Sequence, residues 1–122
     1  QILATNPMDK EMLDRAMEII EKYLDDSEFN VNTFAREMGM ARTNLFSKLK
    51  AVTGQTPNDF ILTIRLKKGA IMLRSNPELN ITEISDRVGF QSPSYFAKIF
   101  QKQFGVTPTE FAQQNKQRMA ED

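Results

Sequence analysis

The side chains with the clearest chemical meaning are cations on segments that hold few acids. Residues 42–53 contain Arg42, Lys48 and Lys50 and no Asp or Glu. Residues 57–75 contain further cations after one acid: Arg65, Lys67, Lys68 and Arg74. Such a field favours phosphate groups, and binding through several phosphate contacts weakens as salt rises. For any one Lys, an ordinary solvated helix face is the simpler interpretation.

The net charge conceals an asymmetry along the chain. Lys plus Arg number 16 and Asp plus Glu number 16, so the 122 residues are formally neutral. Residues 9–28, however, hold eight acids and three bases, a net charge of −5, and the rest of the chain carries +5. A polyanionic ligand is therefore expected to meet the part of the chain after residue 28.

Catalytic chemistry is poorly supported by the residues present. The chain has no Cys and no His, which excludes thiol nucleophiles, disulfides, zinc fingers and His-based acid, base or metal chemistry. Neighbouring acids such as Glu83 and Asp86 fit solvated helix caps better than a catalytic pair. No Gly-rich phosphate loop or nucleophile elbow is present. We expect no catalytic residue, no metal and no cofactor.

The apolar residues recur at helical spacing, as in Leu13, Met17, Ile20 and Leu24, and no stretch alternates as a half-buried strand would. Capping residues mark the helix starts: Asn30, Asn80, Ser92 before Pro93, Thr56 before Pro57, and Thr107 before Pro108, with Glu110 closing a capping box. The sequence predicts an all-α fold of about seven helices near Asp9–Asp25, Val31–Met38, Arg42–Thr53, Pro57–Ser75, Ile81–Val88, Pro93–Phe104 and Pro108–Arg118.

An internal repeat organises these helices. Residues 30–60 align with residues 80–111, at an offset of 50 where Gly39 meets Gly89 and of 51 from Leu45 on, because the second turn is one residue longer. Each copy is a short helix, a turn with Gly, a longer helix, and Gly-x-Thr-Pro opening another helix. The two glycines are expected to supply a left-handed turn. The repeat predicts two helix-turn-helix subdomains.

A long central helix is expected to join the two copies. It is apolar on more than one face, which is typical of a helix packed from several sides. Its 19 residues span about 28 Å, and successive major-groove half-sites lie roughly 34 Å apart. The expected segments are an N-terminal extension (1–8), the leading helix and first helix-turn-helix (9–54), the connecting helix (55–76), the second helix-turn-helix and closing helix (77–118), and a tail (119–122).

Most aromatic residues are expected in the core: Phe34, Phe60, Phe96, Phe100, Phe104 and Phe111. Phe46 and Tyr95 are expected to be exposed. Phe46 could touch a thymine methyl group or simply pack, and the sequence leaves both open. Gly69 within the central helix should cost about 1 kcal/mol relative to Ala unless close packing compensates.

Three motifs carry a resemblance to a known family: GMARTNLFSKLKAVTGQTPNDF, IRLKKGAIML and GFQSPSYFAKIFQKQFGVTP. From about Met12 to Phe111 the chain resembles the DNA-binding domain of AraC/XylS-type transcription regulators. The first copy and the leading helix are also similar to the C-terminal output domain of Bacteroidetes hybrid two-component regulators. The resemblance implies sequence-specific binding of double-stranded DNA, with the second helix of each unit in one of two adjacent major grooves.

The resemblance also implies which residues face the DNA. The base-facing candidates are Arg42, Thr43, Phe46 and Ser47 in the first unit, and Gln91, Pro93, Ser94, Ala97 and Lys98 in the second. The candidates for contacts to the DNA backbone are Lys48, Thr56, Asn58, Thr107 and Thr109. The chain departs from the family pattern at Ala41, where a Ser usually caps the helix, and at Gly69, where Ala is usual. Pro93, Ser94 and Ala97 offer few hydrogen bonds to bases.

The expected partners follow from this resemblance. They are double-stranded DNA, receiver or sensor domains earlier in the same polypeptide, and RNA polymerase. Gln1 in place of Met favours a piece of a longer chain, and no apolar run approaches the roughly 20 residues of a membrane span. We expect this segment to be cytoplasmic, without membrane contact, although the whole protein could be membrane-anchored. A helical protein-interaction module remains the alternative function, and weak salt dependence of binding would distinguish it.

Overall fold

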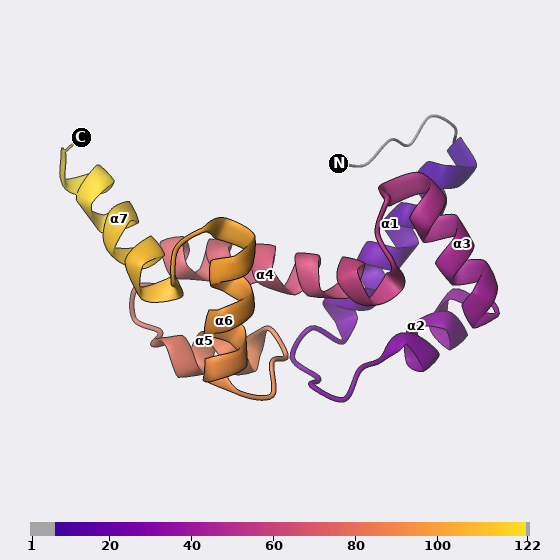
Figure 1. The fold of residues 1–122 in the computed structure, drawn as a ribbon, viewed down its shortest axis with the longest axis horizontal. Coiled ribbons are helices and arrows are strands. Elements are labelled where there is room, and N and C mark those ends of the chain that lie inside the picture. Colours follow the sequence, from indigo (N-terminus) through magenta and orange to yellow (C-terminus); the bar gives the residue numbers. More distant parts are fainter. Residues whose placement is uncertain (1–6, 122) are drawn as a thin grey trace. The chain divides into compact units, whose positions relative to one another are not determined.

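The computed structural model describes residues 7–121, with side chains placed through residue 118 (Figure 1). Every regular element among these residues is a helix, so the predicted all-α fold is confirmed. The helices are α1 (Pro7–Lys22), α2 (Val31–Met38), α3 (Arg42–Thr53), α4 (Pro57–Ser75), α5 (Ile81–Arg87), α6 (Pro93–Phe104) and α7 (Pro108–Glu121).

Three helices differ from the predicted bounds. α1 begins at Pro7 and ends at Lys22, so its predicted bounds of Asp9 and Asp25 were wrong at both ends. α5 ends one residue before Val88, and α7 continues past Arg118 to Glu121. Pro7 accounts for the earlier start, since proline is favoured in the first turn of a helix. The predicted extension and tail fall partly on residues 1–6 and 122, which lie outside the described residues.

The predicted helix caps are confirmed by hydrogen bonds. The Asn30 side chain accepts from the backbone N–H of Thr33 at 3.0 Å, and Ser92 accepts from that of Tyr95 at 3.1 Å. Asn80 forms a complete capping box with Glu83. These bonds satisfy N–H groups that have no partner within the helix, and they fix where each short helix begins.

The two helix-turn-helix turns share one hydrogen-bond pattern. Gly39 and Gly89 adopt left-handed conformations, with φ of 69° and 79°. After Gly39, the N–H of Met40 donates to the carbonyl of Ala35 at 3.0 Å. After Gly89, the N–H of Phe90 donates to the carbonyl of Ser85, also at 3.0 Å. The repeat seen in the sequence is therefore reproduced in the backbone bonds of the turns.

The chain divides into two compact units, and the boundary falls inside α4. Unit 1 comprises Gln1–Leu24 and Glu28–Ile64, and unit 2 comprises Asp25–Ser27 and Arg65–Asp122. Unit 1 contains α1, α2, α3 and the first part of α4, and its buried side chains form one cluster: Leu13, Ala16, Ile19, Ile20, Phe29, Phe34, Ala35, Leu45, Leu49, Phe60, Ile61 and Ile64. Each unit thus has its own core around one helix-turn-helix.

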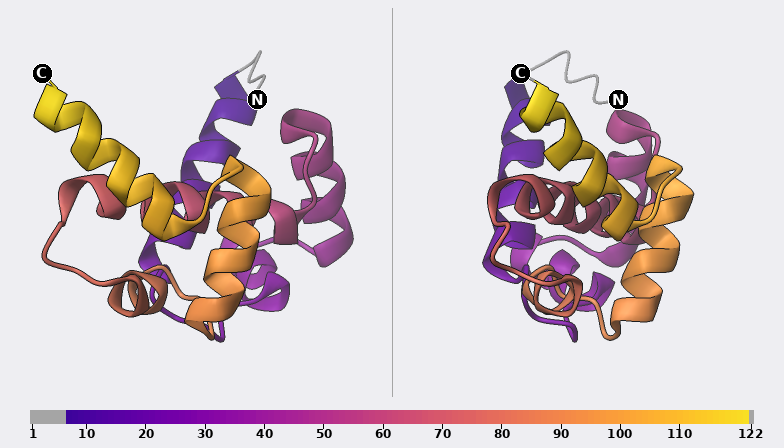
Figure 2. Two further views of the ribbon diagram at one scale, coloured as in Figure 1. Left: turned by 60° about the vertical axis from the view of Figure 1, so that its left-hand side comes forward. Right: turned by 90° about the vertical axis from the view of Figure 1, so that its left-hand side faces the viewer.

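In unit 2, α5 and α6 lie side by side, as both views of Figure 2 show. Its buried apolar residues come from α4, α5, the turn and α6: Leu66, Ala70, Leu73, Ile84, Val88, Phe90, Phe96 and Phe100. The ring of Phe96 lies 5.1 Å from that of Phe90 and 5.7 Å from that of Phe100, measured between centroids. Phe96 and Phe100 lie on the inner face of α6, and Phe90 packs against Phe96 from the turn before that helix.

The structure explains why glycine occurs at position 69, in the interior of α4. A Cβ atom at this position would lie 3.0 Å from Cε1 and 3.1 Å from Cζ of Phe96. The missing side chain therefore lets the ring of α6 approach the backbone of α4. The close packing compensates for the low helix propensity of glycine.

The expected aromatic core is mostly confirmed. Phe34, Phe60, Phe96 and Phe100 are buried, and Phe46 and Tyr95 are exposed. Phe104 and Phe111 are exceptions, because 36% of the Phe104 surface remains exposed at the last position of α6 and Phe111 is only half-buried.

Candidate nucleic-acid interface

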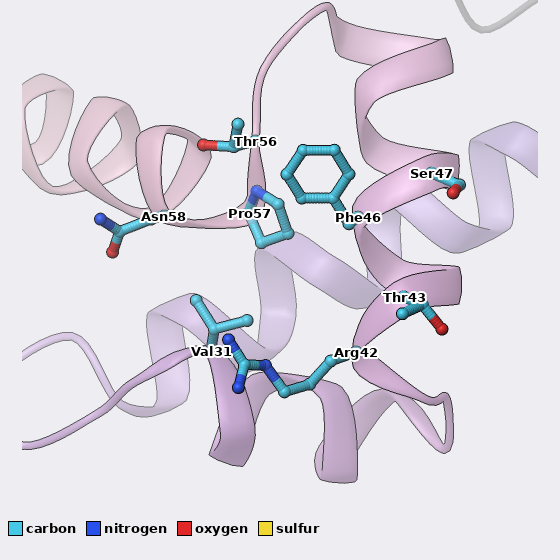
Figure 3. A pocket seen from close by; sticks show the side chains of 8 residues that line it. All are labelled: Val31, Arg42, Thr43, Phe46, Ser47, Thr56, Pro57 and Asn58. Atoms are coloured by element: carbon cyan, nitrogen blue, oxygen red, sulfur yellow. The ribbon is translucent and has the colours of Figure 1, made fainter.

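Unit 1 carries an open concavity between α3 and the start of α4 (Figure 3). Its volume is about 780 Å³. Six of the residues predicted to face DNA line it, together with Val31 and Pro57: Arg42, Thr43, Phe46, Ser47, Thr56 and Asn58. The fold therefore brings the predicted base-facing residues of the first unit together with two of its predicted backbone contacts, Thr56 and Asn58.

Figure 3 shows how these side chains are directed. The Phe46 ring extends from α3 toward Pro57, and the Arg42 side chain extends toward Val31. The hydroxyls of Thr43 and Ser47 point away from Pro57. α3 thus directs a cation and an aromatic ring toward the concavity and two hydroxyls to the adjoining side of the helix, all on exposed residues.

The start of α4 offers hydrogen-bond donors beside that face. The Thr56 hydroxyl accepts from the backbone N–H of Asp59 at 3.2 Å. This bond satisfies one of the first-turn N–H groups that have no partner within the helix. Pro57 has no N–H, so the N–H of Asn58 is the next donor at this helix end. Such a donor, together with the helix dipole, attracts phosphate.

The start of α3 lacks a side-chain cap. Ala41 is the N-cap residue, and its side chain makes no hydrogen bond to the helix. The departure from the family pattern at this position therefore leaves the first-turn N–H groups of α3 without a side-chain partner.

Lys48 does not join the other predicted residues of unit 1. It lines a different groove, about 910 Å³ in volume, with residues of α1 and with the methionines Met8, Met12, Met38 and Met40. Lys48 lies two residues after Phe46, so it points to another face of α3.

In unit 2 the predicted residues lie on α6, on the turn before it and at the start of α7. Gln91, Ser94, Lys98 and Thr109 are exposed, and Thr107 is half-buried. Thr107 and Glu110 form the predicted capping box, with hydrogen bonds of 2.9 Å and 3.1 Å. The N–H donated by Thr107 is the main reason that the pKa of the Glu110 carboxyl is lowered.

Arg65 has a different role from the one its charge indicates. It was counted with the phosphate-attracting cations of the central helix, but only 4% of its surface is exposed, so that interpretation is wrong. Its guanidinium donates to the carbonyls of Val88 at 3.1 Å, Gly89, and Asp26 at 3.0 Å. Burial lowers the pKa of Arg65, and the nearby Asp26 carboxylate opposes this effect.

Arg65 therefore ties the turn of the second helix-turn-helix and the loop before α2 to the helix α4. Sequence reasoning missed this arrangement. One signal was available, because Arg65 lies between Ile64 and Leu66 on a helix predicted to be packed from several sides.

Among the residues that the structure describes, no group of three or more His, Cys, Asp or Glu is arranged to hold a metal ion. Within the same described part of the chain, no helix is long and apolar enough to cross a membrane.

These features define an all-α protein with two helix-turn-helix units, each exposing its second helix. A family profile described as a helix-turn-helix domain matches residues 34–114. The chain belongs to this family, as a DNA-binding domain of AraC-type transcription regulators.

Known proteins similar to the chain agree with this family. A protein from Formosa agariphila named histidine kinase P4 is 44% identical over 109 residues, which cover 89% of this chain and 8% of the kinase. The HTH-type transcriptional regulator MtrA of Neisseria gonorrhoeae is 32% identical over 102 residues, covering 82% of this chain and 34% of the regulator. The chain therefore spans a small part of either relative.

A solved structure has the same fold. The C-terminal domain of AraT, a response regulator from Geobacillus stearothermophilus, superimposes with a TM-score of 0.77 at 28% identity. The match covers 92% of this chain and 88% of the AraT domain.

Proposed function

We propose that this chain recognises a specific double-stranded DNA sequence with two helices, α3 and α6, placed in adjacent major grooves. The observation that carries the proposal is the concavity of unit 1, where base-facing and backbone-facing candidates meet on one surface. A single chain with two such units can read two half-sites about one helical turn apart without forming a dimer.

The proposed roles in unit 1 follow from the chemistry of its side chains. Arg42 is assigned to a guanine, to which a guanidinium donates two hydrogen bonds. Thr43, Phe46 and Ser47 are assigned to base edges on the same face of α3. Thr56 and Asn58 are assigned to a phosphate at the start of α4, and Lys48 to the DNA backbone at the flank of the site.

Unit 2 has fewer groups that can read bases. Gln91 and Ser94 are assigned to base edges, and Thr107 and Thr109 to a phosphate at the start of α7. Lys98 is exposed on α6 and is assigned to the groove, where it contacts either a base or a phosphate. The helix N-terminus of α7 repeats the phosphate-binding chemistry of α4.

Two variants test these roles in a fluorescence anisotropy titration at several salt concentrations. Arg42→Ala should cost about 1 to 3 kcal/mol of binding free energy and relax the preference at one base position. Lys98→Ala should weaken binding to all sequences about equally and reduce the salt slope by about one unit. Lys10→Ala, which removes an exposed cation from the acidic helix α1 outside the proposed surface, is the matched control. An unchanged base preference in Arg42→Ala would remove Arg42 from the reading residues.

The setting of this domain is part of the proposal. The similarity to a histidine kinase of which the chain covers 8% supports an output domain that follows receiver or sensor domains in a hybrid two-component regulator. The predicted segments (1–8, 9–54, 55–76, 77–118 and 119–122) describe its organisation. RNA polymerase is the proposed partner in transcription. We also propose that the domain acts in the cytoplasm, with no membrane contact and no catalytic activity.

A helical protein-interaction module is the second candidate. The groove that contains Met8, Met12, Met38 and Met40 favours it, since flexible methionine side chains suit an apolar partner helix. Binding to such a groove changes little with salt, whereas binding to phosphates weakens steeply. A titration that finds no binding to any duplex at low salt would favour this second function.

A further inference from the structure

Phe46 contributes an aromatic ring to the surface on unit 1. It is an aromatic residue with 48% of its surface exposed, although it lies in the middle of α3. Its ring lines the concavity and extends toward Pro57, while Val31 lines the same concavity near the Arg42 side chain (Figure 3). The neighbouring residues Leu45 and Leu49 are fully buried, so α3 needs no further anchor from Phe46.

The polar groups around the ring limit what this apolar surface can receive. Arg42 lies one helical turn before Phe46, and the start of α4 adds backbone donors at Asn58. A ligand that fits must therefore combine negative charge with a small apolar group. In the major groove of duplex DNA, thymine alone among the four bases presents an apolar group, its 5-methyl.

We infer that Phe46 determines sequence specificity by contacting the 5-methyl group of a thymine in the half-site bound by α3. This inference rests on the proposed function. The methyl group lies on the side of the base that faces its own sugar–phosphate strand. A ring between the base-reading helix α3 and the start of α4 is therefore well placed to meet it.

The position of Arg42 adds a spacing. Arg42 and Phe46 are four residues apart on one helix, so their side chains leave α3 roughly 6 Å, or about one turn, apart along the helix axis. Neighbouring base pairs rise by about 3.4 Å. The guanine assigned to Arg42 and the thymine read by Phe46 are therefore expected within about two base pairs of each other.

The second unit lacks this feature. Ala97 aligns with Phe46 at the offset of 51, and its half-buried methyl side chain cannot replace an exposed ring. Dependence on a thymine methyl is thus expected for the half-site of α3 and not for that of α6. The difference supplies an internal comparison within one bound duplex.

The experiment removes the methyl group alone. Each thymine of a duplex selected by this protein is replaced in turn by deoxyuridine, and affinity is measured by fluorescence anisotropy for the original protein and for Phe46→Ala. For the original protein, one substitution in the half-site of α3 should weaken binding about fourfold, which is the effect of exposing one buried methyl group. Phe46→Ala should bind the thymine and deoxyuridine duplexes equally.

Control variants distinguish a loss of thymine recognition from a loss of stability. Ile71→Ala removes another exposed apolar side chain, one on α4 outside the surface, and should keep the fourfold difference. Phe46→Leu keeps an apolar side chain at this position, so it should retain part of the fourfold difference between thymine and deoxyuridine duplexes. Equal thermal unfolding curves for these variants establish that the comparison concerns the bound complex.

Two results would overturn the inference in different ways. If the original protein binds every deoxyuridine duplex as tightly as thymine DNA, or if the loss persists in Phe46→Ala, the ring does not read the methyl group while the proposed DNA binding stands. If no duplex is selected and binding shows no salt dependence, the proposed function fails and this inference fails with it.

Discussion

Replacing Gly69 by Ala tests how α6 is held against α4. The added Cβ would lie 3.0 Å from Cε1 of Phe96 and 3.1 Å from its Cζ. Both distances are shorter than ordinary carbon–carbon contacts of about 3.5 to 4.0 Å. Either the ring or the helix must therefore shift by several tenths of an ångström.

Two opposing effects decide the stability of Gly69→Ala. Alanine is favoured over glycine within a helix by about 1 kcal/mol. Overpacking a filled core costs about 1 to 3 kcal/mol. Phe96 is fully buried, and Phe90 and Phe100 pack against its ring, so we expect the overpacking to be large. The net result should be a loss of about 1 to 2 kcal/mol in the free energy of unfolding.

Urea unfolding followed by circular dichroism measures this loss, and Phe96→Leu provides the control. In the Phe96→Leu background the ring edge is absent, so Gly69→Ala should be neutral or stabilising, because only the gain in helix propensity remains. The coupling between the two substitutions is then the energy of the contact. A stabilisation of about 1 kcal/mol by Gly69→Ala in the original chain would contradict this expectation, since it would mean that the Phe96 ring can move away from the added methyl group at little cost.

Three further substitutions have expected effects on urea unfolding. Arg65→Met should lower the free energy of unfolding by about 3 kcal/mol or more, because three carbonyls lose a charged donor; a loss below about 1 kcal/mol would contradict this role. Ala41→Ser should raise it by about 1 kcal/mol by capping α3, and an unchanged midpoint would mean that the cap does not form. Ser85→Ala should raise it by about 1 kcal/mol, because the buried hydroxyl has no hydrogen-bond partner among the described residues and the aligned residue of the first copy is Ala35; a decrease would indicate a partner such as bound water.

The fold was predictable because its local signals agree with one another. Asn30, Asn80 and Ser92 cap the helices that they were predicted to begin. Gly39 and Gly89 form the predicted left-handed turns. Each of these features depends on a few neighbouring residues, so the sequence alone defines it. The repeat then predicts the same local structure twice.

The features that were not predictable depend on contacts between distant segments. The charge of Arg65 indicates solvent or phosphate, but its guanidinium is buried against carbonyls 23, 24 and 39 residues away in the sequence. The helix propensity of Gly69 is unfavourable, and only the close approach of the Phe96 ring explains why glycine occurs there. The ends of α1 also differ from the prediction, because hydrophobic spacing locates a helix better than it locates the helix ends.

The candidate site was predicted in part. The resemblance to the AraC type indicated the residues of the first unit, and the structure brings six of them to one concavity. It could not indicate that Lys48 lines another groove. Which residues contact DNA remains a prediction for both units.

Selection of bound duplexes from a random pool, followed by sequencing, shows whether one chain reads DNA with two helices. We expect enrichment of two short blocks about one helical turn apart, with affinity that falls steeply as salt rises. The block bound by α3 should contain a guanine and a thymine within about two base pairs. Enrichment of a single block, or of no sequence at all, would contradict the reading of DNA by two helices of one chain.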